Sequence, residues 1–184
     1  MSDGMFRTVT GLRRGYDPDE VDAFFAHART VYETGPAGAL SGRDVRSAAF
    51  ELVRGGYSPV AVDAALDRLE AAFVARARAE YVAEHGQGAW MERLGDQART
   101  LYPRLGRPDG ERFAPPEGRA PGYEAADVDA LCHRLVDYFD DGAPLTAAEL
   151  RTATFRARRG RGAYAEAPVD AFLARAVEVL LGVE

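Results

Sequence analysis

The sequence contains no lysine, isoleucine or asparagine, so all 23 of its basic residues are arginine. These three amino acids have AT-rich codons, and their absence is typical of a GC-rich bacterial genome. The arginine excess therefore requires no special function at each position. The formal net charge of -6 also argues against a general nucleic-acid binder, because such binding needs clustered excess positive charge. Any basic function is expected to be local.

Cysteine and long apolar segments are scarce as well. The single cysteine cannot form an internal disulfide, so the fold is not expected to depend on an oxidising compartment. No run approaches the roughly 20 apolar residues of a transmembrane helix, and Met1 to Phe6 contain no apolar segment typical of a signal peptide. We therefore expect a cytoplasmic protein whose 184 residues are enough to bury a real core.

One short pattern occurs four times along the chain. A tyrosine precedes a Val-Asp pair by the same distance each time, and a glycine precedes the tyrosine in the first three copies. The residues are Gly15, Tyr16, Val21 and Asp22; Gly56, Tyr57, Val62 and Asp63; Gly122, Tyr123, Val128 and Asp129; and Tyr164, Val169 and Asp170, after Ala163. The copies also pair into a larger duplication, because Phe6 recurs as Phe113 with the same spacing to the tyrosine. Such internal similarity indicates a repeated structural unit.

Apolar residues follow each Val-Asp pair at the spacing of a helix with one buried face. Four helix starts can be recognised from capping residues, namely Asp17 before Pro18, Ser58 before Pro59, Ser41 with Asp44, and Thr146 with Glu149. No stretch alternates with period two over the length of a strand. The sequence therefore predicts an all-α fold of short amphipathic helices in tandem repeats, joined by tight Gly-Tyr turns.

The expected organisation is a first pair of motifs in 1–85, a connecting helix and linker in 86–112, and a second pair of motifs in 113–184. The apolar stripe of the second motif ends at Phe73, and the next heptad positions are occupied by Arg76 and Glu80. No seam persists for the three to four heptads that identify a coiled coil. An extended coiled coil is therefore not expected.

The glycine and aspartate of the motif have predicted structural roles. Glycine before tyrosine suggests a positive φ, and Gly162 is the candidate for it in the copy that has Ala163. The four aspartates are expected on separate helices without a His or Cys grouping, which disfavours a catalytic or metal site. We expect dipole stabilisation, capping, or a bond to a nearby Arg or Tyr hydroxyl, with Arg46 and Arg151 favoured as partners.

The first copy, from Phe6 and then Arg13 through Phe25, resembles the DivIVA domain family, in particular actinobacterial proteins with several degenerate copies. The resemblance implies a cell-division or polar-growth scaffold in which a helical dimer presents a loop tip to the inner membrane surface. That tip lies between the Phe and the Gly-Tyr and combines an apolar residue with basic neighbours. The positions carried over are Leu12, Arg13 and Arg14; Leu52, Val53 and Arg54; and Arg156, Arg158, Arg159 and Arg161.

The expected function is a non-catalytic adaptor or scaffold that binds protein partners or itself, with weak contact to anionic lipid at the inner face of the cell membrane. The alternative is a soluble protein-binding or regulatory module without membrane association. No cofactor, metal, nucleic acid or small-molecule substrate is expected. Cys132 and His133 are adjacent and so point to different faces of a helix, and Cys132 is predicted to be a core residue.

Overall fold

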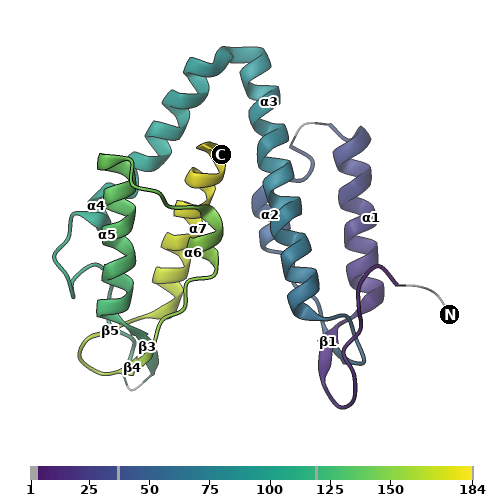
Figure 1. Cartoon of the computed structure of the whole chain (residues 1–184), viewed down its shortest axis with the longest axis horizontal. Helices are drawn as coiled ribbons and strands as arrows, with labels where there is room; N and C mark the ends of the chain where they lie inside the picture. The colour runs from purple at the N-terminus through teal and green to yellow at the C-terminus, as the bar shows by residue number, and fades with distance from the viewer. Residues whose placement is uncertain (1–3, 37, 119, 184) are drawn as a thin grey trace. The chain divides into compact units, whose positions relative to one another are not determined.

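The computed structural model describes residues 4–36, 38–118 and 120–183. The chain divides into two compact units, Met1–Gly86 (unit 1) and Gln87–Glu184 (unit 2). Nearly all of the segment 86–112, which was expected to connect two halves, belongs to unit 2. In Figure 1, each unit is a group of helices with short strands at one end.

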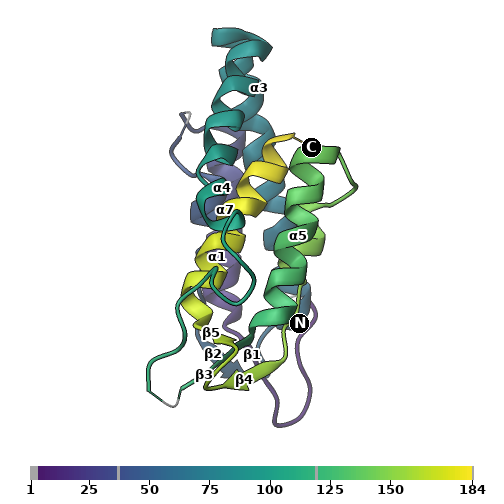
Figure 2. The ribbon, with the colours of Figure 1, turned by 90° about the vertical axis from the view of Figure 1, so that its left-hand side faces the viewer.

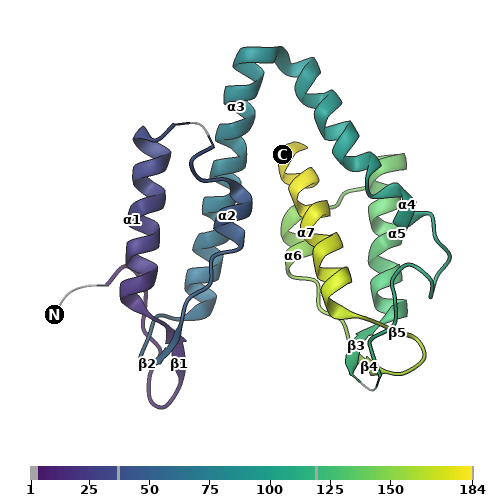
Figure 3. The same cartoon turned by 180° about the vertical axis from the view of Figure 1, so that it is seen from behind.

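Unit 1 contains β1 (Arg14–Tyr16), α1 (Pro18–Thr34), α2 (Gly42–Arg46), β2 (Leu52–Arg54) and the first part of α3 (Pro59–Arg99). Helix α3 is interrupted at Gly86, which has a non-helical φ of 85°. Strands β1 and β2 pair antiparallel, with Gly15 opposite Val53. Figure 3 shows this pair at the end of unit 1 where α1 begins.

Three of the predicted helix caps are confirmed, and α3 begins at Pro59, directly after Ser58, as expected. The Asp17 side chain accepts hydrogen bonds from the backbone N–H groups of Asp19 and Glu20 at the start of α1. Ser41 and Asp44 form both bonds of a capping box, and Thr146 and Glu149 form the same box in unit 2. These bonds satisfy backbone donors that lack partners at a helix start.

The core of unit 1 is formed by the inner faces of α1 and α3 together with α2. Its buried residues include Val21, Tyr57 and Val62 at the strand end, and Ala28, Val31, Val45 and Phe73 further along the helices. Arg76, which interrupts the heptad pattern, donates to the carbonyl oxygens of Val31, Tyr32 and Gly35 at 2.6–2.9 Å. Arg76 therefore caps the C-terminal end of α1 by bonding to the carbonyl groups at that end.

Unit 2 contains the rest of α3 and then α4 (Tyr102–Leu105), β3 (Pro121–Glu124), α5 (Ala125–Asp141), α6 (Ala147–Arg151), β4 (Ala157–Arg159), β5 (Ala163–Tyr164) and α7 (Glu166–Val183). The three strands form one antiparallel sheet in the order β4-β3-β5. In Figure 2, this sheet lies at the end of unit 2 where α5 and α7 begin.

Helix α7 is buried on more than one face, because Val177, Val179, Leu180 and Leu181 are all at most 7% exposed. The part of α3 in unit 2 supplies one of the covering surfaces. Trp90 is buried and donates its indole N–H to the carbonyl of Gly182 at 3.0 Å. The covering helix explains why the last helix of the chain is apolar almost throughout.

The fold is mostly helical, but the expectation that it is purely all-α is wrong. The Gly-Tyr segments expected to be tight turns are extended: Gly15 and Tyr16 lie in β1, and Gly122 and Tyr123 lie in β3. The strands are two to four residues long. Segments this short cannot show an alternating pattern, and their pairing depends on contacts distant in sequence.

Candidate functional site

The tyrosine of each motif bonds to the aspartate of the other motif in the same unit. In unit 1, the Tyr57 hydroxyl donates to Asp22 Oδ2 at 3.0 Å, and the Tyr16 hydroxyl bonds to Asp63. Burial raises the pKa of Tyr16, and the Asp63 carboxylate raises it further. Burial also raises the pKa of Asp63, although the bond from Tyr16 opposes this.

Unit 2 repeats this crosswise arrangement. The Tyr164 hydroxyl lies 3.0 and 3.2 Å from the two Asp129 oxygens, and Tyr123 bonds to Asp170. Burial, with the bond to Asp129, raises the pKa of Tyr164 to about 12. Each motif aspartate thus bonds to a Tyr hydroxyl, which is one of the expected structural roles. Of the two arginines predicted as partners, Arg46 and Arg151, Arg46 has its Nη1 3.6 Å from Glu70 Oε1.

The motif glycines are required by close backbone contacts, so the predicted positive φ at these positions is wrong. Gly15, Gly56 and Gly122 are absent from the residues with positive φ. A Cβ atom would lie 2.2 Å from the Tyr57 carbonyl oxygen at Gly15 and 2.1 Å from that of Tyr164 at Gly122. Gly162, before Ala163, does have a φ of 80°, as expected.

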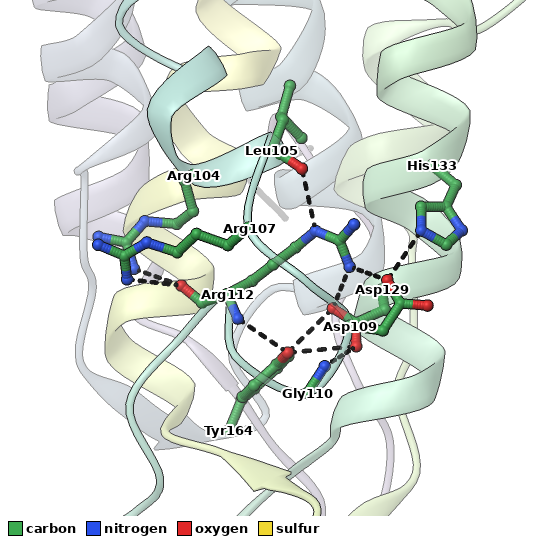
Figure 4. Close-up of polar contacts among 9 residues, drawn as sticks. All are labelled: Arg104, Leu105, Arg107, Asp109, Gly110, Arg112, Asp129, His133 and Tyr164. Carbon is green, nitrogen blue, oxygen red and sulfur yellow. Dashed lines mark hydrogen bonds and ion pairs between the residues drawn. The ribbon is translucent and has the colours of Figure 1, made fainter.

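A buried polar network surrounds Asp129 in unit 2 (Figure 4). Arg112 is 4% exposed, and its Nη1 lies 2.7 Å from Asp129 Oδ1. The backbone N–H of Gly110 donates to Asp129 Oδ2 at 2.8 Å. With Tyr164, these donors satisfy both carboxylate oxygens, as a buried charge requires.

The network reaches the surface at Asp109 and His133. Arg112 also bonds to Asp109, and His133 Nε2 lies 2.9 Å from Asp109 Oδ1. The bond from Arg112, followed by that from His133, lowers the pKa of Asp109. A shallow pocket of about 530 Å³ adjoins these groups and is lined by Asp109, Gly110, Glu124, Ala125, Ala126, Asp129, Ala130, His133 and Gly162.

The residue of unit 1 that is equivalent to Arg112 is Met5. Its backbone N–H donates to the Tyr57 hydroxyl at 2.9 Å, as that of Arg112 donates to the Tyr164 hydroxyl at 3.1 Å. The Met5 side chain cannot pair with a carboxylate, and Asp22 Oδ1 is buried without a hydrogen-bond partner among the described residues. Arg112 was not identified from the sequence. The signal was present, because Arg112 directly precedes Phe113 as Met5 directly precedes the equivalent Phe6.

Cys132 is fully buried, as predicted. Burial raises the pKa of its thiol to about 12, so the group is a neutral thiol at pH 7. Within residues 4–36, 38–118 and 120–183, no cluster of His, Cys, Asp and Glu has the arrangement of a metal site.

The unit 1 tip, comprising residues 7–14 and 52–55, combines apolar and basic side chains. Leu12 is 84% exposed and Leu52 is 51% exposed. The four arginines of the tip are exposed, and none forms an ion pair within the described part of the chain; they are Arg7, Arg13, Arg14 and Arg54. Arg14 lies directly opposite Arg54 in the β1–β2 pair, with Val53 next to it.

The unit 2 tip, residues 156–162, differs because Arg156 and Arg158 are ion-paired. Arg156 bonds to both Asp127 oxygens, which lowers the pKa of Asp127 to about 2. Arg158 lies 3.0 Å from Glu124. Arg159 and Arg161 are exposed. The sequence-predicted contact residues therefore fall into two electrostatically different tips.

Within the described ranges, no helix is long and apolar enough to cross a membrane. Comparison of the chain with protein-family models, curated proteins and solved structures found no match.

Proposed function

We propose that this chain is a non-catalytic, DivIVA-like repeat adaptor that binds protein partners and contacts anionic lipid through the unit 1 tip. The repeat interpretation is supported by the crosswise Tyr–Asp bonds, which join equivalent residues in the two units. It is also supported by the strand pairing, because Gly15 lies opposite Val53 and Gly122 lies opposite Arg158 in antiparallel pairs.

The observation that carries the lipid contact is the composition of the unit 1 tip. A leucine that is 84% exposed extends from a loop among four arginines that have no carboxylate partner in the described residues. Near an anionic membrane surface each Arg contributes about 1 kcal/mol. Burying a leucine side chain contributes a further ~1.5–3 kcal/mol. Weak, reversible binding to an anionic membrane is the result that these terms predict.

The paired strands of the tip strengthen the argument. Arg14 and Arg54 face each other across β1 and β2, and like charges in directly opposite positions destabilise a strand pair. An anionic surface would remove this repulsion. The Arg14–Arg54 arrangement therefore favours binding to an anionic surface, although it destabilises the β1–β2 pair in the absence of that surface.

The unit 2 tip is a weaker candidate, although its sequence has four arginines in six residues. Asp127 and Glu124 already neutralise Arg156 and Arg158. Neither Leu nor another large apolar side chain is among the exposed residues of this tip. We therefore assign the lipid contact to Leu12, Arg13 and Arg14 and their neighbours in β2.

The non-catalytic part of the proposal is supported by the use of polar groups in unit 2. The Asp129 carboxylate accepts bonds from Gly110, Arg112 and Tyr164, and Cys132 is a buried neutral thiol. These groups serve the packing of helices. A role in cell division or polar growth rests on the DivIVA resemblance, and fluorescent tagging tests it by the presence of septal or polar foci.

Vesicle co-sedimentation tests the lipid contact. We expect the wild-type chain to pellet with phosphatidylglycerol vesicles at low salt and to remain in solution with pure phosphatidylcholine. The variant R13A/R14A should lose most of this binding, and Leu12→Ser should weaken it. The matched control R159A/R161A removes the same charge from the unit 2 tip and should pellet like the wild type.

Equal pelleting of the wild type and R13A/R14A would exclude this tip as the lipid contact. Absence of wild-type pelleting at low salt would favour the alternative, a soluble protein-binding module. Circular dichroism of each variant establishes that the helices are retained.

A further inference from the structure

Arg104 and Arg107 form a pair of guanidinium groups in unit 2, apart from both tips. Arg104 Nη1 donates to the backbone carbonyl oxygen of Arg112 at 2.8 Å, and Arg107 Nη1 reaches the same oxygen at 3.5 Å. Figure 4 shows the two groups side by side, on the opposite side of Arg112 from Asp109 and His133. Two positive charges are therefore held within a few ångströms of each other.

No carboxylate of the described residues forms an ion pair with Arg104 or Arg107. One carbonyl oxygen carries only a partial charge and accepts a single strong bond at 2.8 Å. Each guanidinium has five N–H donors, so most of the donors remain available.

Arg104 is also fixed in place before any ligand arrives. Its Cζ atom lies 4.9 Å from the centre of the buried Phe113 ring, and its Nη1 is bonded to the backbone. Stacking on an aromatic ring and a backbone bond restrict the rotamers of this long side chain. Ordering before binding reduces the entropy lost when a ligand binds.

We propose that Arg104 and Arg107 form a binding site for a phosphate group. A phosphate monoester carries a charge of about −1.5 to −2 at pH 7, which matches two guanidinium charges, whereas a carboxylate neutralises only one. The planar N–H forks of arginine also suit bidentate bonds to phosphate oxygens. This proposal does not rest on the lipid contact, since it involves neither tip.

The test uses Trp90, the only tryptophan, whose burial in unit 2 makes its fluorescence a report on the unfolding of that unit. A ligand that binds the folded state raises the unfolding midpoint. We expect inorganic phosphate to raise the midpoint of the full-length wild type more than chloride at equal ionic strength. Arg107→Ala should weaken phosphate binding about tenfold or more, because hydrogen bonds to charged groups are strong.

Two controls separate this site from other arginines. Arg161→Ala removes an exposed arginine from the unit 2 tip, and R13A/R14A removes charge from the unit 1 tip; both should respond to phosphate as the wild type does. A peptide carrying one phosphoserine identifies the source of the phosphate group. Tighter binding of the peptide than of inorganic phosphate supports a site for a protein segment, and equal binding supports a site for free phosphate.

The proposal is overturned if Arg107→Ala keeps the full response to phosphate, or if the wild type responds no more to phosphate than to chloride. Arg107 is exposed, so its replacement is expected to leave unit 2 folded. The Trp90 unfolding curve without phosphate checks this for each variant.

Discussion

Replacement of Arg112 by methionine should destabilise unit 2 strongly. The Arg112 and Asp129 side chains are each 5% exposed, and their charged atoms are 2.7 Å apart. Arg112→Met leaves Asp129 with bonds from Gly110 and Tyr164 but without an opposite charge at Oδ1. Removing one partner of a buried ion pair costs about 3–5 kcal/mol. We expect the lower end, about 3 kcal/mol, because these two donors remain.

Trp90 fluorescence during thermal unfolding measures the effect. In a domain of this size 1 kcal/mol changes the midpoint by about 4–8 °C, so the midpoint of Arg112→Met should fall by about 12 °C or more. The double variant Arg112→Met with Asp129→Asn should recover a large part of the loss, because a neutral amide needs no counter-charge. An unchanged midpoint for Arg112→Met would refute the reasoning.

The converse change in unit 1 is a reciprocal test. Met5→Arg places a guanidinium where Asp22 Oδ1 has no hydrogen-bond partner among the described residues. We expect a gain of about 1 kcal/mol, since a hydrogen bond to a charged group is offset by side-chain entropy. Circular dichroism follows the helices of both units, and Trp90 fluorescence assigns the unit 2 transition, so the remaining transition is that of unit 1. A loss of stability in that transition would show that the two positions are not equivalent.

Two further perturbations follow from the contacts. Gly122→Ala should destabilise unit 2 by about 1–3 kcal/mol, because its Cβ would lie 2.1 Å from the Tyr164 carbonyl oxygen; Gly95→Ala, whose Cβ meets nothing within 4 Å, should be neutral or stabilising in urea unfolding. The Arg156–Asp127 pair should contribute stability above the pKa of an unfolded aspartate and lose it progressively as the pH falls from about 4 through about 2, the pKa at which folded Asp127 is half-protonated. Arg156→Ala should therefore be less stable than the wild type at pH 7, and the difference should shrink as the pH falls and disappear only below about pH 2, as measured by denaturant midpoints.

Features that depend on neighbouring residues could be predicted from the sequence. The caps at Asp17, Ser41 and Thr146 require side chains only two or three residues from the backbone groups they bind. Burial of Val21, Val62, Val128 and Val169 followed from helical periodicity, and each is 0% exposed. Local chemistry and burial agree at these positions, as in most foldable sequences.

Features that depend on contacts between motifs could not be predicted in this way. The tight approach of Gly15 to the Tyr57 carbonyl oxygen exists only once two distant segments have paired. Arg112 belongs to no local pattern and acquires its role from Asp129, 17 residues away. The ion pairs of Arg156 and Arg158 likewise involve acids about 30 residues earlier, so counting arginines overestimated the charge available at that tip.

Because each crosswise Tyr–Asp bond joins the two motifs of one unit, the smallest fragment of this chain that is expected to fold is a complete unit. A fragment that ends between the two motifs of one unit retains one motif tyrosine and one motif aspartate, but each has lost the residue to which it bonds. A truncation series should therefore give folded products only when both motifs of a unit are kept.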